Sequence, residues 1–145
     1  MFKGFKKKFV KVNRGKIFCR VGGNGPPLLL LHGYPQTHIM WHKTANELSK
    51  SFTLIVADLR GYGSSFILKS DKKHMNYSKR EMAKDMVQLM DKLGFKKFCI
   101  AGHDRGGRVA HRLARDYRKK VVAMSVLDIC PTLDMYELTE KNFAK

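Results

Sequence analysis

The sequence predicts an α/β fold with a mostly parallel sheet and helices on both of its faces. Short, continuous apolar runs alternate along the chain with segments in which apolar residues recur at helical spacing. Unbroken apolar runs are typical of strands that are buried on both faces of a parallel sheet. A third observation is a glycine-flanked turn, Gly102–Gly107, that lies between one such run and one such segment. A chain of 145 residues is within the usual range of a single domain and can bury a core.

Four apolar runs predict the strands. In chain order they cover residues 27–31, 54–57, 98–101 and 121–127. Glycine-rich or turn-rich stretches adjoin the first two, at 22–26 and 58–65, and these indicate loops at the ends of the strands.

Three segments between the runs predict helices. Their apolar positions are Trp41, Ala45 and Leu48 in the first, Met82, Met86, Leu89, Met90 and Leu93 in the second, and Val109, Ala110, Leu113, Ala114 and Tyr117 in the third. Ser78 and Glu81 form a capping-box pair at the start of the second helix, and Gly94 is a typical stop signal at its end. A fourth helix is expected to begin within residues 134–143.

The turn Gly102–Gly107 has the pattern of a nucleophile elbow, a sharp strand-to-helix turn that exposes its central side chain. Glycines on both sides relieve crowding where the backbone reverses. The central residue is usually serine, which gives acyl transfer, whereas a carboxylate can attack carbon and form an ester intermediate. The pattern alone also fits a tight turn with a solvated acid. Because predicted strands and helices surround it, we take Asp104 as the candidate nucleophile.

Four motifs carry a resemblance to a known family. They are His32–Gln36, Asp58–Gly63, Gly102–Arg108, and Leu127–Ile129 with Pro131 and Thr132. Together they resemble the Asp-nucleophile branch of the α/β-hydrolases, and within it the haloacetate (fluoroacetate) dehalogenases. The first two motifs are shared with epoxide hydrolases. The third is more specific, because epoxide hydrolases and haloalkane dehalogenases usually have Trp directly after the nucleophile, where this chain has Arg105.

The resemblance implies a small 2-halo acid as substrate, whose carboxylate would repel that of Asp104. Arg105 and Arg108 are three residues apart at the start of a predicted helix, so both lie on one face. Guanidinium groups match carboxylate geometry, and a helix N-terminus favours anions. We therefore expect the two arginines to bind the substrate carboxylate and to orient its α-carbon for displacement of halide by Asp104. The same pair also fits an ordinary charged helix face in a chain this rich in Arg and Lys.

The resemblance implies further roles in hydrolysis of the ester. Asp128, directly after the last predicted strand, would orient the histidine that activates water, although a turn residue also fits that position. The backbone N–H groups of Tyr34 and Arg105 would form the oxyanion hole. His32 and His103 flank these donors, and we expect them to hold loops in place.

The family's catalytic histidine lies far towards the C-terminus, beyond a helical cap, and this sequence ends at Lys145. Its remaining histidines match no family base position and are expected on surface helices or loops: His38, His42, His74 and His111. We therefore expect residues 1–145 to be the N-terminal portion of an α/β-hydrolase core domain, without cap and C-terminal part, and with an unpaired apolar edge after the 121–127 strand. Such a portion could exist in three forms, as a fragment of a disrupted gene, as one half of a split enzyme completed by another polypeptide, or as a shortened but stable domain. In function, an epoxide hydrolase-like enzyme and a non-catalytic chain stay open beside the dehalogenase.

Composition limits the partners. Lys and Arg outnumber Asp and Glu by 29 to 12, which gives a formal charge of +17, and several basic and Phe residues share the first eleven positions. Such an excess is compatible with nucleic acid, but it is spread along the chain without a nucleic-acid motif, so we do not expect this partner. A complementing C-terminal polypeptide and a homo-oligomer are left open. No apolar stretch is long enough to span a membrane, and the first residues lack the apolar region and cleavage site of a signal peptide, so we expect neither feature.

Three cysteines without metal-ligand spacing are expected to be buried free thiols in a reducing compartment. We accordingly expect a cytoplasmic protein that uses no cofactor and no metal.

Overall fold

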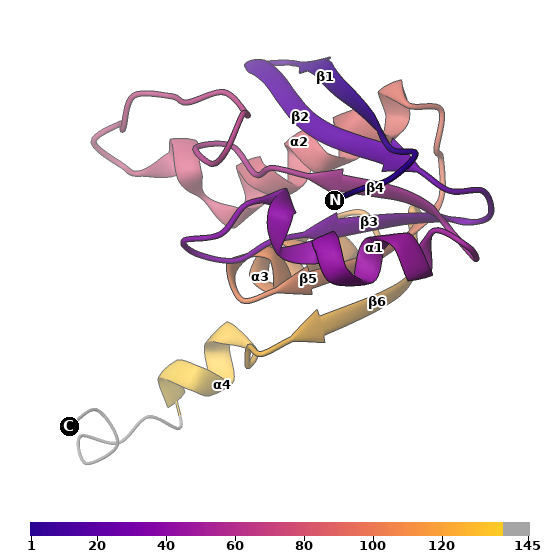
Figure 1. Cartoon of the computed structure of the whole chain (residues 1–145). Helices are drawn as coiled ribbons and strands as arrows, with labels where there is room; N and C mark the ends of the chain where they lie inside the picture. The colour runs from indigo at the N-terminus through magenta and orange to yellow at the C-terminus, as the bar shows by residue number, and fades with distance from the viewer. Residues whose placement is uncertain (138–145) are drawn as a thin grey trace.

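The structure, a computed structural model, describes residues 1–137 as a six-stranded mixed sheet with helices on both faces (Figure 1). The strands stand in the order β1-β2-β4-β3-β5-β6. Their bounds are β1 Lys6–Val12, β2 Gly15–Gly22, β3 Pro27–Leu31, β4 Thr53–Ala57, β5 Phe98–His103 and β6 Val121–Leu127. The four strands from β4 to β6 in this order are parallel, and each coincides with a predicted apolar run. The α/β prediction is confirmed.

The first two strands form an antiparallel hairpin that the apolar runs did not predict. A two-residue turn joins Val12 to Gly15, and β2 continues the sheet by pairing antiparallel with β4. The residues of β1 are mostly exposed, so this strand lacks the continuous apolar run that marks the central strands. The segment before β1 also packs against the sheet. Phe2 is only 3% exposed and packs in the core, while the Arg20 guanidinium lies 4.9 Å from its ring centroid.

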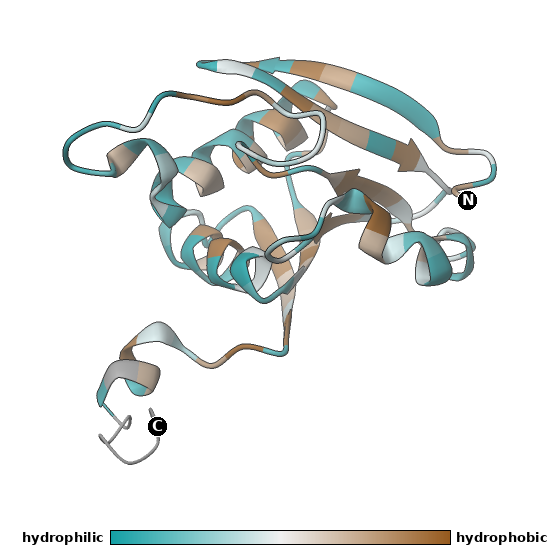
Figure 2. Ribbon diagram, turned by 60° about the vertical axis from the view of Figure 1, so that its left-hand side comes forward, coloured by the Kyte–Doolittle hydropathy of each residue, from teal (hydrophilic) through white to brown (hydrophobic). Residues whose placement is uncertain are grey.

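The two faces of the sheet are covered by different helices. On one face lie α2 (Lys79–Lys92) and α3 (Arg105–Asp116), and on the other lie the short 3₁₀ turn η1 (His38–Trp41) and α1 (His42–Leu48). Along β3, Leu29 and Leu31 belong to the first core, whereas Leu28 and Leu30 belong to the second. This alternation explains why the central runs are apolar at every position, and Figure 2 shows hydrophobic residues gathered in the middle of the sheet.

Sequence signals define the ends of α2. The Ser78 side chain accepts a hydrogen bond from the Glu81 N–H at 3.3 Å, as the capping pair predicts, while the Glu81 carboxylate pairs with Lys84. After the helix, Gly94 has φ of +90°, a conformation that glycine adopts without strain. A second 3₁₀ turn, η2 (Met75–Tyr77), precedes α2. The last helix, α4, covers Thr132–Glu137, so it begins two residues before the predicted segment, whose residues 138–143 lie outside the described part.

Strand β6 forms one edge of the sheet, with α4 beyond it (Figure 1). Within residues 1–137 it pairs only with β5, and its apolar side chains are exposed, Val122 to 67%. This agrees with the apolar edge expected from the sequence.

The cysteine prediction is partly wrong: Cys19 is buried, but Cys99 is half-buried and Cys130, which follows the edge strand, is exposed. Among the helices of the described residues, none is long and apolar enough to cross a membrane.

Candidate active site

Asp104 lies at an abrupt junction between β5 and α3. Strand β5 ends at His103 and α3 begins at Arg105, so Asp104 alone makes the turn, with φ of +45° and ψ of −115°. The turn is possible because glycine backbones pass very close to each other. A Cβ atom added to Gly106 would lie 2.5 Å from the His32 carbonyl oxygen, and one added to Gly102 would overlap the Gly106 carbonyl.

Two backbone N–H groups hold the Asp104 carboxylate. The Tyr34 N–H donates to its Oδ2 at 2.8 Å, and the Arg105 N–H donates to the same carboxylate. Partial burial raises the pKa of Asp104, but these two hydrogen bonds and the nearby charges of His103 and Arg105 outweigh that effect, so its pKa lies below the ordinary value. The side chain is therefore a carboxylate at neutral pH. The structure thus brings Tyr34 and Arg105, the two predicted oxyanion-hole residues, to one carboxylate.

An open pocket of about 410 Å³ adjoins this carboxylate. Its lining consists of Tyr34, Lys79, Asp104, Arg105 and Arg108. The Arg105 guanidinium lies 4.8 Å from the Tyr34 ring centroid. Lys79 was not predicted, because it is one of many basic residues and only the fold brings the start of α2 beside the start of α3. The carboxylate of Asp104 thus shares its pocket with three cationic side chains.

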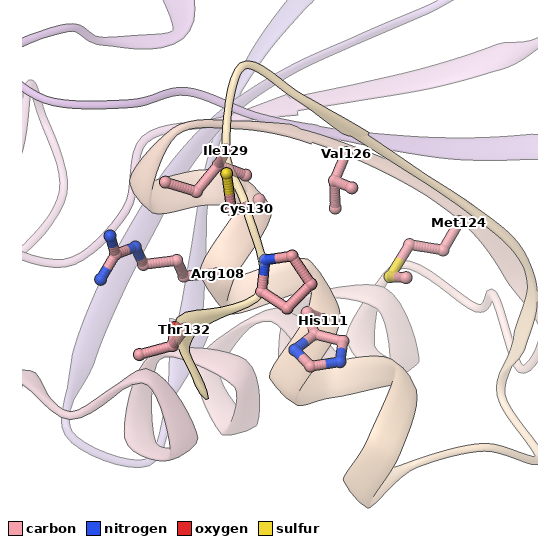
Figure 3. Close-up of a pocket in the computed structure, with 9 residues that line it drawn as sticks. Arg108, His111, Met124, Val126, Ile129, Cys130 and Thr132 are labelled. Atoms are coloured by element: carbon pink, nitrogen blue, oxygen red, sulfur yellow. The ribbon is translucent and has the colours of Figure 1, made fainter. Parts of the chain in front are cut away.

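Arg108 lies between this pocket and an apolar one. The apolar pocket, about 280 Å³ in volume, is lined by residues of α3, β6 and the segment after β6, including Val126 and Ile129. Figure 3 shows that the Arg108 guanidinium points away from Val126 and Met124. Its Nε is buried and has no hydrogen-bond partner among residues 1–137, and its Nη2 lies 3.4 Å from the Met135 sulfur. A buried N–H donor without an acceptor is costly.

Asp128 stands apart from the pocket lining. It follows β6 with φ of +53°, and its side chain is 87% exposed. Its Oδ2 lies 3.5 Å from Nε2 of His103, whose Nδ1 lies 3.1 Å from Oε1 of Gln36. Both ring nitrogens of His103 therefore have partners, which agrees with its expected role in holding loops. The structure brings four predicted site residues together, and it places Asp128 beside the elbow but outside the pocket.

His32 joins the loops behind the site, as the sequence predicted. It is fully buried; its Nδ1 lies 2.8 Å from the Gly33 carbonyl oxygen, and its Nε2 accepts a hydrogen bond from the Leu59 N–H at 3.0 Å. Burial lowers the pKa of His32, so the ring is neutral and can donate at Nδ1 while it accepts at Nε2.

The predicted surface position of His38 is wrong. This residue is 7% exposed, because the 3₁₀ turn η1 directs it inward against the rings of Phe2 and Phe18. Its Nδ1 lies 2.9 Å from Oδ1 of Asp58, which also accepts from the His38 N–H at 2.7 Å. Burial alone would raise the pKa of Asp58. Its hydrogen bonds with His38 and Ser64 have the larger, opposite effect, so its pKa lies below the ordinary value. This buried pair fixes the loops after β3 and β4 relative to each other.

Among the described residues, no three His, Cys, Asp or Glu side chains converge as a metal site would require.

Comparisons with known proteins agree with this geometry. The sequence model of the alpha/beta hydrolase fold family matches residues 26–145. A fluoroacetate dehalogenase from Burkholderia sp. is 48% identical over 145 residues, which are 100% of this chain and 48% of that protein. A soluble epoxide hydrolase from Corynebacterium sp. (strain C12) is 38% identical over 84% of this chain and 41% of its own length.

A solved structure from Nostoc sp. PCC 7120, described as an alpha/beta hydrolase, superposes with a TM-score of 0.96 at 51% identity. It covers 99% of this chain, which covers 50% of that structure. The chain therefore spans about half the length of the relatives that it matches. From the family match, the elbow and the sheet order together, we conclude that this chain belongs to the α/β-hydrolase fold family, whose relatives named here are hydrolases.

Proposed function

We propose that this chain carries the nucleophile portion of a haloacetate dehalogenase, an enzyme that hydrolyses small 2-halo acids. One observation supports this most strongly: an ionised carboxylate, Asp104, lies in a pocket whose other charged residues are all cations. The 48% identity to a fluoroacetate dehalogenase supports the same substrate class. In this proposal residues 1–145 are the N-terminal portion of the core domain, and a cap and C-terminal part lie outside them.

The first step is displacement of halide at the α-carbon. An oxygen of the Asp104 carboxylate forms a bond to that carbon while the carbon–halogen bond breaks, and the halide leaves with the electron pair of that bond. The product is an ester between Asp104 and the substrate. The Tyr34 N–H donates to Oδ2, so we take Oδ1 as the attacking atom.

The arginines make this attack possible, because substrate and nucleophile are both anions. Arg105 and Arg108, which both line the pocket, would pair with the substrate carboxylate through their guanidinium groups. Binding of this kind also orients the α-carbon in line with Oδ1. Positioning can lower a barrier by about 7–11 kcal/mol in the best cases.

The second step is hydrolysis of the ester. Water attacks Cγ of Asp104 and gives up a proton to a histidine base. The bond between Cγ and the ester oxygen then breaks, this oxygen takes the proton and leaves as the hydroxyl of the 2-hydroxy acid, and the water oxygen restores the carboxylate. The N–H groups of Tyr34 and Arg105 stabilise the negative charge of the tetrahedral intermediate, where loss of one donor costs about 2.7–4 kcal/mol. Both nitrogens of His103 are engaged, so we assign the base to a histidine outside these 145 residues, with Asp128 as its partner.

Opening of an epoxide by the same Asp104 is the second candidate, and the 38% identity to a soluble epoxide hydrolase supports it. An epoxide is neutral and needs no cation to reach the nucleophile. Three cations in a pocket of five residues therefore favour an anionic substrate over an epoxide.

Incubation with chloroacetate, followed by intact-mass measurement and peptide mapping, tests the proposal. We expect one carboxymethyl group on Asp104, stable because its hydrolysis lacks a base. Mapping separates this ester from alkylation of the exposed thiol of Cys130. Asp104→Asn should lose the ester. Asp91→Asn, at the C-terminal end of α2 and outside the pocket lining, should keep it. Modification by styrene oxide but not by chloroacetate would favour the epoxide reaction, and an unmodified Asp104 with both reagents would refute both.

A further inference from the structure

Lys79 lines the catalytic pocket from a different helix than the two arginines do. It is the first residue of α2, directly after the capping residue Ser78, whereas Arg105 and Arg108 are on the first turn of α3. Lys79 is half-buried, but the next residue, Arg80, is exposed and pairs with Asp116 at 3.1 Å. The fold therefore directs one of two consecutive basic residues into the pocket and the other to solvent.

The contacts of the three cations differ. Arg105 is held by aromatic residues, with its guanidinium 4.8 Å from the Tyr34 ring centroid and its Nη1 3.5 Å from the Tyr62 hydroxyl. Within residues 1–137, Lys79 has neither a hydrogen-bonding side-chain partner nor an ion pair within 4.0 Å, although it shares the pocket with Asp104. Its ammonium group is thus available to a ligand.

We propose that Lys79 is a third substrate-binding cation, which binds the carboxylate of the halo acid together with the arginines and sets the affinity of the pocket for small carboxylates. The assignment rests on the proposed function, because it takes the pocket to be the substrate site. It goes further in that it makes recognition of the anion depend on α2 as well as on the elbow helix. An ammonium can approach a carboxylate oxygen from many directions, so Lys79 complements the fixed geometry of the guanidinium groups.

The charge balance of the pocket predicts how pH affects binding. Burial lowers the pKa of Lys79, the charges of Arg105 and Arg108 lower it further, and the charge of Asp104 partly opposes them. A bound carboxylate adds negative charge beside Lys79 and raises its pKa. The contribution of Lys79 to affinity is therefore complete below its pKa in the free protein, and it is lost as pH rises through its pKa in the complex. Arginine in its place would stay charged over this range.

The affinity of the 145-residue chain for trifluoroacetate, measured by ¹⁹F NMR titration, tests this assignment without any displacement chemistry. We expect Lys79→Met and Lys79→Gln to weaken binding about tenfold, as loss of one charge-assisted contact implies. Lys79→Arg should restore most of the affinity. The matched control is Lys92→Met, which removes the same charge about 20 Å away at the other end of α2. The affinity of the wild type should fall as pH rises through the alkaline range, while that of Lys79→Arg should not.

Equal affinities of Lys79→Met and Lys92→Met would overturn the assignment, as would wild-type protein that does not bind trifluoroacetate. Thermal unfolding of each variant shows whether a loss of binding reflects a loss of the fold. The test is independent of the reaction: if chloroacetate leaves Asp104 unmodified while Lys79→Met still weakens trifluoroacetate binding, the proposed chemistry fails and the role of Lys79 in anion binding stands.

Discussion

At the scale of single residues, the strained turn at Asp104 is held in place from two sides. A non-glycine residue at φ of +45° costs on the order of 1–3 kcal/mol. The backbone N–H of Asp104 donates to the Leu127 carbonyl at 3.0 Å, and its carboxylate accepts from Tyr34. Neighbouring strands and loops therefore fix both the backbone and the side chain. The turn presents the carboxylate to the pocket in a single orientation.

The geometry of Arg108 leads to a prediction about its replacement by lysine. Arg108→Lys keeps the charge but loses Nε and the planar donor pair, so we expect alkylation of Asp104 by chloroacetate to slow about tenfold. Arg112→Lys, one turn further along α3, should react at the wild-type rate, because Arg112 binds Asp116 at 2.6 Å and does not line this pocket. The rate of ester formation, followed by mass spectrometry, checks both. Equal rates for the two variants would exclude a specific role for the Arg108 guanidinium.

The sequence predicts most of the residues in this pocket and misses one. Asp104 is marked by its glycines, and Arg105 and Arg108 follow from helical spacing in the adjacent turn. Lys79 is separated from them by more than twenty positions, and nothing in its local sequence distinguishes it from the other basic residues. His38 was misplaced for a similar reason, because a polar residue in a loop is buried only when a distant partner, here Asp58, satisfies it.

At the scale of elements, a buried ion pair connects the loop after β4 to α2. Arg60 is 1% exposed and binds both carboxylate oxygens of Asp85, with Nε 2.5 Å from Oδ2 and Nη2 2.6 Å from Oδ1. Its guanidinium also donates to the carbonyls of Asn76 and Glu81. These contacts hold the N-terminal half of α2, and with it Lys79, against the sheet.

Removal of one partner of this pair should be costly. We expect Arg60→Met to lower the free energy of unfolding by about 3–5 kcal/mol, because Asp85 would be left buried and unpaired. Arg80→Met, which removes an exposed partner of Asp116, should change it little. Urea unfolding followed by circular dichroism measures both differences. A loss below about 1 kcal/mol for Arg60→Met would contradict this view of the pair.

The central elements were predictable because each carries a strong local pattern. Strands β3 to β6 are short apolar runs, and α2 has a capping serine at one end and a glycine after the other. The β1–β2 hairpin lacks such a run, since most residues of β1 face solvent. The one feature that could have indicated the hairpin is the short connection between Val12 and Gly15, because two-residue loops are the commonest connections in hairpins.

At the scale of the whole molecule, β6 combines an edge position with exposed apolar side chains. Such an edge can pair with another strand. We expect the 145-residue chain to self-associate as its concentration rises, and Val122→Lys to shift it towards monomer. Ile67→Lys, which changes an exposed apolar residue of a loop, is the control and should leave association unchanged. Sedimentation velocity over a range of concentrations distinguishes these outcomes. A wild-type chain that stays monomeric over the whole concentration range would show that β6 does not pair with a second chain.

The most direct test of the account is the rate at which Asp104 becomes esterified as the chloroacetate concentration is raised. If the cationic pocket binds the halo acid and presents its α-carbon to Asp104, the rate will reach a plateau, and trifluoroacetate will compete. A rate that rises in proportion to concentration, is insensitive to trifluoroacetate, and is matched at other carboxylates of the chain would contradict the account.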